Sequence, residues 1–268
     1  MSRLTETAYA KLNLALHVRG KRADGYHAIE TIFAFCEDGD ALSAEGADSL
    51  SLDVSGPFAA DIPDDDANLA IEAARLFRLA TDVSAGARLQ LIKILPVASG
   101  IGGGSADAAA VLRLLTRMWT IPASVAVEVA PLLGADVPAC LLSQSCRGDG
   151  TGDQVGPIEL GLGGTPVLLI NHGAPLSTKA VFERWDGMDR GPLDDWREGR
   201  NDLEVAAISL VPEIADVLHW LRGQAGAEVV HMSGSGATCF ALFADEAARD
   251  LAATHVPPPW WHLATRLR

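Results

Sequence analysis

The opening stretch of the chain alternates between apolar and polar side chains. Residues 7–19 place one set on each face, with Leu12, Leu14, Leu16 and Val18 on the first and Lys11, Asn13 and His17 on the second. A period of two predicts a β-strand with one buried and one solvated face. Asp24 and Gly25 follow it and form a turn signal, which predicts a hairpin to the next strand.

Further along the chain, strand and helix patterns mix without strict alternation. Strands are expected over residues 28–35, 49–54, 88–95, 137–142, 166–171, 228–232, 238–243 and 260–267. Helical spacing is found over residues 68–80, 106–119, 124–133, 177–185, 202–222 and 245–253. Asp66 or Asn68 can cap the first helix, Ser177 can cap the fourth, and Pro212 interrupts the fifth. This order predicts an α+β protein in two layers, with a loose domain boundary near residue 155.

A glycine-rich loop joins a predicted strand to a predicted helix. It contains Gly100, Gly102, Gly103, Gly104 and Ser105. Glycine lets the backbone approach a phosphate closely, and a helix N-terminus presents unpaired N–H groups at the positive end of its dipole. The loop lacks the lysine of a Walker motif and the sixth-position glycine of the dinucleotide fingerprint. It therefore indicates a third kind of anion-binding loop, with a flexible linker as the alternative.

Composition narrows the possible partners. The 268 residues carry a formal net charge of -14, which disfavours nucleic acid and anionic membranes. An anionic small molecule stays possible, because a helix end, a lysine and a cation can make a site locally positive. Four cysteines without CxxC spacing indicate reduced thiols. With no signal-peptide or membrane-spanning pattern, we expect a cytoplasmic protein that is a monomer or a weak homodimer.

Two charged residues are candidates for catalysis. Asp136 lies between a glycine turn and an apolar run, so it could accept a proton from a hydroxyl in a cleft, or act only as a cap. Lys11 lies in an apolar strand, where a lysine usually faces solvent. Alternatively it pairs with an acid and offsets charge on a moving phosphoryl group. The sequence by itself leaves open whether the two side chains meet.

Weaker indications come from aromatic and small residues. Tyr26 and His27 follow the hairpin turn and could stack on and read a nucleobase, or could be ordinary hairpin residues. Phe182 is equally consistent with a helix core. The Ser-Gly-Ser-Gly segment at 233–236 is either a hairpin turn or a second backbone nest near the phosphates. The sequence shows no zinc-type ligand spacing.

Three segments together resemble the GHMP kinases, named for galactokinase, homoserine kinase, mevalonate kinase and phosphomevalonate kinase. They are Ala10-Lys-Leu-Asn-Leu, the loop at 96–109 and Ser233-Gly-Ser-Gly-Ala. Arg22-Ala-Asp-Gly-Tyr-His and Leu133-Gly-Ala-Asp-Val-Pro resemble the branch that acts on a cytidine diphosphate derivative of methylerythritol. The resemblance implies a two-domain α+β fold. Residues 1–155 would be similar to domain 2 of ribosomal protein S5, and residues 156–268 would form an α/β sandwich of ferredoxin-like type.

The resemblance also implies roles for individual residues. Asp136 would be the base, and Lys11 its electrostatic partner. The implied ATP-binding residues are Asn68, Lys93, Pro96, Val97, Ala98, Ser99, Gly100, Ile101, Gly102, Gly103, Gly104, Ser105 and Ala106. The implied substrate-binding residues are Asn13, Tyr26, His27, Asp136, Thr178 and Phe182. Of these, Tyr26 and Phe182 would enclose the cytosine, and His27 would read its edge.

The implied reaction transfers the ATP γ-phosphoryl group, with Mg²⁺, to the 2-hydroxyl of the cytidine diphosphate substrate in the non-mevalonate route to isoprenoids. The loop departs from many relatives by reading Ser105-Ala-Asp where they have Ser-Ser-Asn, so one hydroxyl is absent. The metal ligands are left open. The alternatives are another GHMP kinase, acting on mevalonate, homoserine or a sugar, and a non-catalytic nucleotide-binding module.

Overall fold

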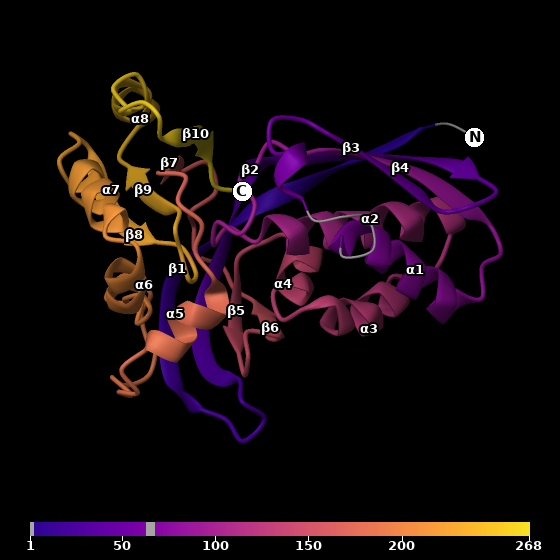
Figure 1. Ribbon diagram of the computed structural model, residues 1–268, viewed down its shortest axis with the longest axis horizontal. Helices are drawn as coiled ribbons and strands as arrows, with labels where there is room; N and C mark the ends of the chain where they lie inside the picture. The colour runs from indigo at the N-terminus through magenta and orange to yellow at the C-terminus, as the bar shows by residue number, and fades with distance from the viewer. Residues whose placement is uncertain (1–2, 63–67) are drawn as a thin grey trace. The chain divides into compact units, whose positions relative to one another are not determined.

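The computed structural model describes residues 3–62 and 68–268, which fall into two compact units (Figure 1). Unit 1 is formed by Met1–Ala10, Asp38–Val97 and Gly102–Ser143, and unit 2 by Lys11–Glu37, Ala98–Ile101 and Gln144–Arg268. The two long strands β1 (Leu4–Lys21) and β2 (His27–Ala47) each continue from one unit into the other. The division into family domains near residue 155 stays a proposal.

Unit 1 is a sheet with helices packed beside it. Strand β4 (Gly86–Ile92) pairs in parallel with β3 (Ser51–Ser55) and antiparallel with the last part of β2. The helices of this unit gather on one side of these strands in Figure 1: α1 (Leu69–Thr81), α2 (Gly103–Trp119), α3 (Ala123–Leu133) and α4 (Val137–Leu142). A short 3-10 turn, η1 (Ala59–Asp61), follows β3. Large apolar side chains such as Leu89 and Phe77 are fully buried in the core of unit 1.

The ends of the helices confirm some of the expected signals and correct others. Asn68 caps α1, since its Oδ1 accepts the N–H of Ala70 at 2.8 Å, whereas Asp66 lies outside the described residues. Helix α2 begins at Gly103, three residues earlier than residue 106, so part of the glycine-rich loop is the first turn of a helix. Residues 137–142 were expected as a strand and are helix α4. A six-residue apolar run does not reveal its period, but Pro138 fits the first turn of a helix.

Strand β1 is buried on both faces. The alternation over residues 7–19 correctly predicts the strand, but the expectation of a solvated face is wrong. Lys11 is 2% exposed, and Asn13 and His17 are each 3% exposed. The expectation fails because both faces of this stretch are covered by other parts of the chain, which a strand's own sequence does not show. Lys11 is therefore a buried lysine whose ammonium needs polar partners.

Unit 2 contains an antiparallel sheet in the order β10 (Trp261–Arg266), β7 (Pro166–Asn171), β9 (Cys239–Phe243), β8 (Ala227–Met232). Its helices are α5 (Thr178–Arg184), α6 (Glu204–Leu210), α7 (Glu213–Arg222) and α8 (Glu246–Ala253). As expected, Pro212 separates α6 from α7 and Ser177 caps α5. Leu168, Ile170 and Val217 belong to the buried core of this unit.

A small hairpin of two strands pairs with the first part of β2 and adds to its sheet. Strand β5 (Cys146–Asp149) pairs with β2, where Thr31 lies opposite Gly148, and β6 (Gln154–Pro157) pairs with β5. Gly148 and Asp149, at the start of a glycine-rich stretch, are the last two residues of β5. Beyond this hairpin the chain enters the second sheet at β7.

Candidate active site

The glycine-rich loop leads directly into the N-terminus of helix α2. Gly102 is the N-cap and has a left-handed backbone, with φ of 67°, which glycine adopts without steric cost. The N–H of Ala106 donates to the carbonyl of Gly102 at 2.8 Å and closes the first helical turn. Helix geometry leaves the N–H groups of residues 103–105 without partners inside the helix. With the dipole of a 17-residue helix behind them, these groups form a candidate anion-binding site.

The preceding part of the loop, Ala98–Ile101, is held by the connection between β8 and β9. The hydroxyl of Ser233 donates to the carbonyl of Gly100 at 2.9 Å, and the N–H of Thr238 donates to the carbonyl of Ser99 at 3.0 Å. A Cβ on Gly100 would lie 2.4 Å from the carbonyl oxygen of Ser233. The segment 233–236 is thus the turn of a hairpin, and it also braces the first glycine-rich loop.

Lys11 and Asn13 form a buried polar pair beside this brace. The Lys11 ammonium donates to Asn13 Oδ1 at 2.8 Å, and its Nζ lies 5.0 Å from the centre of the Phe33 ring. Asn13 Nδ2 donates in turn to Thr31 Oγ1 at 2.8 Å, and the Asn13 N–H donates to Ser233 Oγ at 3.2 Å. The amide of Asn13 therefore has a fixed orientation, and it fixes where the ammonium lies.

Asp136 lies in unit 1 at the N-cap position of the short helix α4. It is partly exposed, and its side chain makes no capping hydrogen bond to that helix. A cap role therefore does not explain the residue. Lys11 belongs to unit 2. The pairing of its ammonium with the Asp136 carboxylate stays a prediction.

Aromatic rings gather in unit 2 between the end of the first hairpin and helix α5. His27 stacks on Phe182, with ring centres 4.9 Å apart, and meets the edge of Trp185 at 5.6 Å. Burial, followed by repulsion from Lys21, lowers the pKa of His27, which favours a neutral ring with one donor and one acceptor nitrogen. Tyr26 is 66% exposed. The structure thus brings His27 and Phe182 together and leaves the Tyr26 ring on the surface.

Thr178 starts helix α5 on the same side of unit 2. Its hydroxyl and that of Ser235 lie within hydrogen-bonding distance, at 2.9 Å. This contact joins the helix that carries Phe182 to the second glycine-rich segment. Thr178 is therefore connected to the loop brace as well as to the aromatic group.

Lys93 is buried in unit 1 and is held by two carboxylates. Its ammonium donates to Asp40 Oδ2 and, at 2.7 Å, to Asp107 Oδ2. The second oxygen of Asp40 accepts the N–H groups of Ile94 and Leu95, at 2.6 and 2.9 Å. Burial opposes the charge of Lys93, but the Asp107 and Asp40 carboxylates outweigh it and raise the pKa of the ammonium.

Asp107 is the less satisfied carboxyl of this group. Burial raises its pKa to about 7, against the opposing effect of Lys93 and with a smaller contribution from Asp40. Its Oδ1 is buried and has no hydrogen-bond partner among the residues that the structure describes. Asp107 is the last residue of the Ser105-Ala-Asp segment, in which many relatives of the family carry an asparagine.

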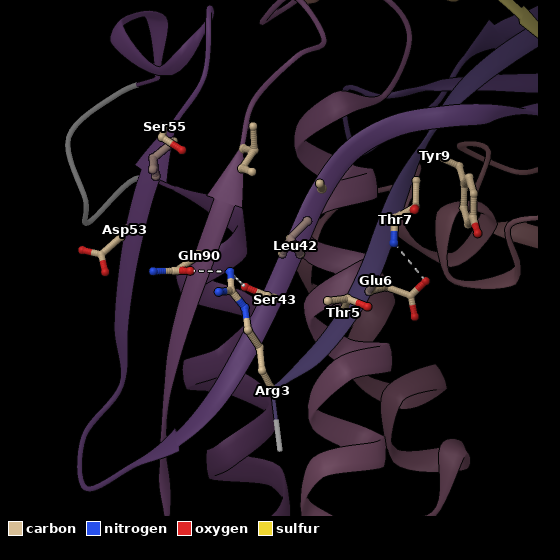
Figure 2. A pocket seen from close by; sticks show the side chains of 13 residues that line it. Arg3, Thr5, Glu6, Thr7, Tyr9, Leu42, Ser43, Asp53, Ser55 and Gln90 are labelled. Atoms are coloured by element: carbon tan, nitrogen blue, oxygen red, sulfur yellow. Dashed lines mark hydrogen bonds between the residues drawn. The ribbon is translucent and has the colours of Figure 1, made fainter. Parts of the chain in front are cut away.

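A hollow of about 720 Å³ lies elsewhere on unit 1, on the sheet formed by β1 to β4 (Figure 2). In Figure 2 the Arg3 side chain crosses it and donates to Gln90 and Ser43. None of its lining residues is a predicted site residue.

Within 3–62 and 68–268, no helix is long and apolar enough to cross a membrane. The same described residues hold no cluster of three His, Cys, Asp or Glu side chains that could bind a metal.

Sequence reasoning did not single out several residues of these groups. Asp40 and Thr31 lie on β2, and neither belongs to a local motif. Trp185 lies three residues after Phe182 in the helix expected over residues 177–185, a spacing that could have identified it, although in the structure α5 ends at Arg184 and Trp185 is its C-cap. Ser233 belongs to a segment that the family resemblance includes, but its contact with Gly100 joins residues 133 positions apart, so no local pattern indicates it.

A small-molecule kinase needs an anion-binding helix N-terminus, a fixed cation and a carboxylate. Unit 1 supplies the start of α2 and Asp136, and unit 2 supplies the buried Lys11. Two family models match the chain: the N-terminal domain of GHMP kinases over residues 68–144 and the C-terminal domain over residues 186–257. Relatives named 4-diphosphocytidyl-2-C-methyl-D-erythritol kinase are closely similar in sequence. That of Novosphingobium aromaticivorans is 51% identical, covering 99% of this chain and 93% of the relative. That of Rhizorhabdus wittichii is 50% identical, covering 98% and 94%.

Solved structures agree with this result. A crystal structure of 4-(cytidine 5'-diphospho)-2C-methyl-D-erythritol kinase matches with a TM-score of 0.84 and 33% identity, covering 98% of this chain and 99% of that one. Homoserine kinase from Cytophaga hutchinsonii matches with a TM-score of 0.73 at 16% identity, which shows a shared fold alone. The chain belongs to the GHMP kinase family, in the branch of these cytidyl-methylerythritol kinases, and the two-domain α+β fold expected from the sequence is confirmed.

Proposed function

We propose that this chain transfers the γ-phosphoryl group of ATP to the 2-hydroxyl of 4-diphosphocytidyl-2-C-methyl-D-erythritol, giving the 2-phosphate and ADP in isoprenoid precursor synthesis. The observation that carries the proposal is the buried ammonium of Lys11, fixed by Asn13 next to the braced glycine-rich loop of unit 2. A lysine is almost never fully buried unless it is paired, and a paired ammonium in a fixed place can offset the charge of a phosphoryl group. The names of the relatives support the same substrate.

The proposed chemistry requires alignment and charge stabilisation more than covalent participation. The N–H groups that open helix α2 bind the ATP phosphates. Asp136 accepts the proton of the substrate hydroxyl. At the same time the hydroxyl oxygen bonds to the γ-phosphorus, and the bond between the γ-phosphorus and the oxygen that bridges it to the β-phosphorus breaks to release ADP. Lys11 favours the ionised form of Asp136 and offsets negative charge at the attacking oxygen.

The cytosine of the substrate is proposed to bind at the aromatic group of unit 2. Phe182 offers a ring face, and the neutral His27 offers one donor and one acceptor for the polar edge of the base. Tyr26, exposed at the hairpin end, covers the base from the other side. Asn13 and Thr178 contact the polar remainder of the substrate.

Mg²⁺ is proposed to arrive with ATP and to neutralise its phosphates. This ion commonly binds through substrate phosphates, waters and one or two carboxylates, so a three-ligand cluster of protein side chains is not required. The described residues contain no cluster of three such side chains, and binding through the ATP phosphates does not need one. We assign the ion no protein ligand, and each step above is carried by residues of the chain.

The composition of the chain supports a proposal for its partners and its cellular location. A net charge of -14 disfavours nucleic acid, and four cysteines without paired spacing suit a reducing compartment. We propose a cytoplasmic enzyme that acts as a monomer or a weak homodimer. Sedimentation at micromolar concentration tests the oligomeric state.

Replacing the proposed base tests the mechanism. Asp136→Asn removes the proton acceptor and its charge, so we expect turnover to fall by about 10³-fold while a non-hydrolysable ATP analogue still binds. Asp82→Asn makes the same chemical change at an exposed position of unit 1 and should leave turnover unchanged. Turnover of the Asp136 variant within a few-fold of wild type would remove this residue from the mechanism.

A further inference from the structure

Three charged side chains that the proposed chemistry does not use are buried together in unit 1. Lys93 is 2% exposed, Asp107 is 3% exposed and Asp40 is fully buried. The ammonium is held by both carboxylates, and Asp40 also accepts the N–H groups of Ile94 and Leu95. We call these three residues the buried ion cluster. An ammonium so enclosed is not presented to a nucleotide.

The buried ion cluster joins the segments that lead into the candidate phosphate site. Asp40 comes from β2, Lys93 directly follows β4, and Asp107 lies in the second turn of α2. The Lys93 Nζ lies 3.0 Å from the place where a Cβ on Gly103 would stand. The ammonium thus lies against the first residue of α2, where a Cβ would require the Lys93 side chain to shift.

A gain in stability is a poor explanation for such a cluster. Removing charged groups from water is costly, and apolar residues of the same size often stabilise a protein equally well. Fixed geometry is a better explanation, because charged hydrogen bonds in a closed site tolerate little displacement. The segment that they fix is the first turn of α2, whose N–H groups must match the positions of the phosphates.

We propose that Lys93, held between Asp40 and Asp107, is a positioning residue that sets the first turn of α2 for ATP without touching the nucleotide. This inference rests on the proposed function, since it takes that turn as the ATP phosphate site. It changes the role of Lys93 from a lining residue of the nucleotide pocket to a support beneath it. In this proposal Asp107, at a position where many relatives carry an asparagine, holds the Lys93 ammonium in place.

Two substitutions of Asp107 separate position from charge. Asp107→Asn keeps an oxygen for Lys93 and places an amide where Oδ1 has no partner. Asp107→Leu keeps the size but removes the hydrogen bond. We expect Asp107→Leu to weaken the binding of a non-hydrolysable ATP analogue by about tenfold, and Asp107→Asn to stay within about twofold of wild type. Asp53→Leu, at an exposed position of unit 1, is the matched control and should change nothing.

The measurements are calorimetric titration of the analogue with Mg²⁺ and the kinetic constants of the folded variants. We expect the KM for ATP to follow the analogue, while kcat at saturating ATP and the KM of the cytidine substrate change by less than about twofold. Equal losses in both Asp107 variants would show that charge matters rather than position, and would overturn the proposal. Tighter binding of the ATP analogue by Asp107→Leu would indicate that Lys93 contacts ATP itself. Unchanged binding by this variant would show that the buried ion cluster does not position the phosphate site.

The outcome is separable from the proposed function. Failure of the wild-type protein to phosphorylate the cytidine substrate would refute that function, whereas the titration of the ATP analogue would still decide the role of the buried ion cluster.

Discussion

Lys11 is a candidate catalytic residue whose surroundings differ from those that its strand pattern favours. Its strand pattern predicts a solvated ammonium, but the side chain is buried with Asn13 Oδ1 at 2.8 Å and the Phe33 ring at 5.0 Å. The hydrogen bond to Asn13 and the contact with the Phe33 ring are two of the interactions that compensate the ammonium for its loss of water. A charge held in a fixed place in this way suits the proposed role in charge stabilisation.

At the same scale, Asp107 should make stability depend on pH. Its pKa is raised in the folded protein from 3.8 to about 7, so between these values the folded chain holds a proton that the unfolded chain has released. The stabilising contribution is complete below 3.8, falls as pH rises toward 7 and is absent above it. We expect Asp107→Asn to remove this part of the pH dependence, as measured by urea unfolding from pH 5 to pH 8.

The charged groups that act on Asp107 among the described residues are Lys93 and Asp40, and both remain in that variant. The difference in unfolding free energy between wild type and Asp107→Asn should therefore move steadily in favour of the variant as pH rises. A difference that is constant across this range would show that Asp107 keeps the same charge throughout.

At the scale of elements, the two glycine-rich loops of unit 2 form one structure. Gly100 has a φ of 80°, and a Cβ there would lie 2.4 Å from the carbonyl of Ser233 and 2.6 Å from that of Gly236. Both obstacles are backbone atoms and neither can move without opening the β8–β9 turn. Gly100→Ala should therefore lower the free energy of unfolding by about 3 kcal/mol, more than strain at a positive φ alone would cost.

Gly187 provides the control for this prediction. Its φ is also 80°, but no atom lies within 4 Å of the place where its Cβ would stand. Gly187→Ala should therefore show the cost of the backbone conformation alone, about 1 kcal/mol. Equal losses for Gly100→Ala and Gly187→Ala in urea unfolding would mean that the close approach of the two loops contributes nothing.

Elements with strong local signals could be predicted from sequence. The cap at Asn68, the break at Pro212 and the strand over residues 166–171 are all found where the pattern places them. Residues 137–142 could not be assigned, because a six-residue apolar run fits either a strand or a short helix. The start of α2 was placed late because glycines are poor helix formers, yet the packing in unit 1 carries the helix back to Gly103.

Candidate site residues could be selected from sequence only where they lie in a local motif. Resemblance to the family indicated Lys11, His27 and Phe182, whereas Asp40 lies in no local motif and its partner Lys93 is distant in sequence. Asp40 lies 53 residues from Lys93, and no spacing rule connects such a pair. The sequence also gave no sign that β1, β2 and the glycine-rich loop each contribute to both units.

At the scale of the whole molecule, a chain with net charge -14 must attract two anionic nucleotides. The overall field opposes both, so the proposed mechanism requires local donors: the start of α2 for one nucleotide and polar groups near the His27 and Phe182 rings for the other. These two groups belong to different units of the chain. A kinase with two such sites should bind an adenine and a cytidine nucleotide together, whereas a nucleotide-binding module with one site should not.

Thermal unfolding with ligands distinguishes these two cases. At about 100 times its Kd, each ligand should add about 2.7 kcal/mol to the free energy of unfolding. We expect the increments of a non-hydrolysable ATP analogue with Mg²⁺ and of CDP to sum when both are present. Phe182→Ala should abolish the CDP increment and leave that of the ATP analogue intact, because it removes the ring proposed to stack on cytosine, together with its contact to His27, and both lie in unit 2 whereas α2 lies in unit 1. If the two nucleotides instead exclude each other in the wild-type protein, the chain has a single nucleotide site and the two-substrate mechanism is wrong.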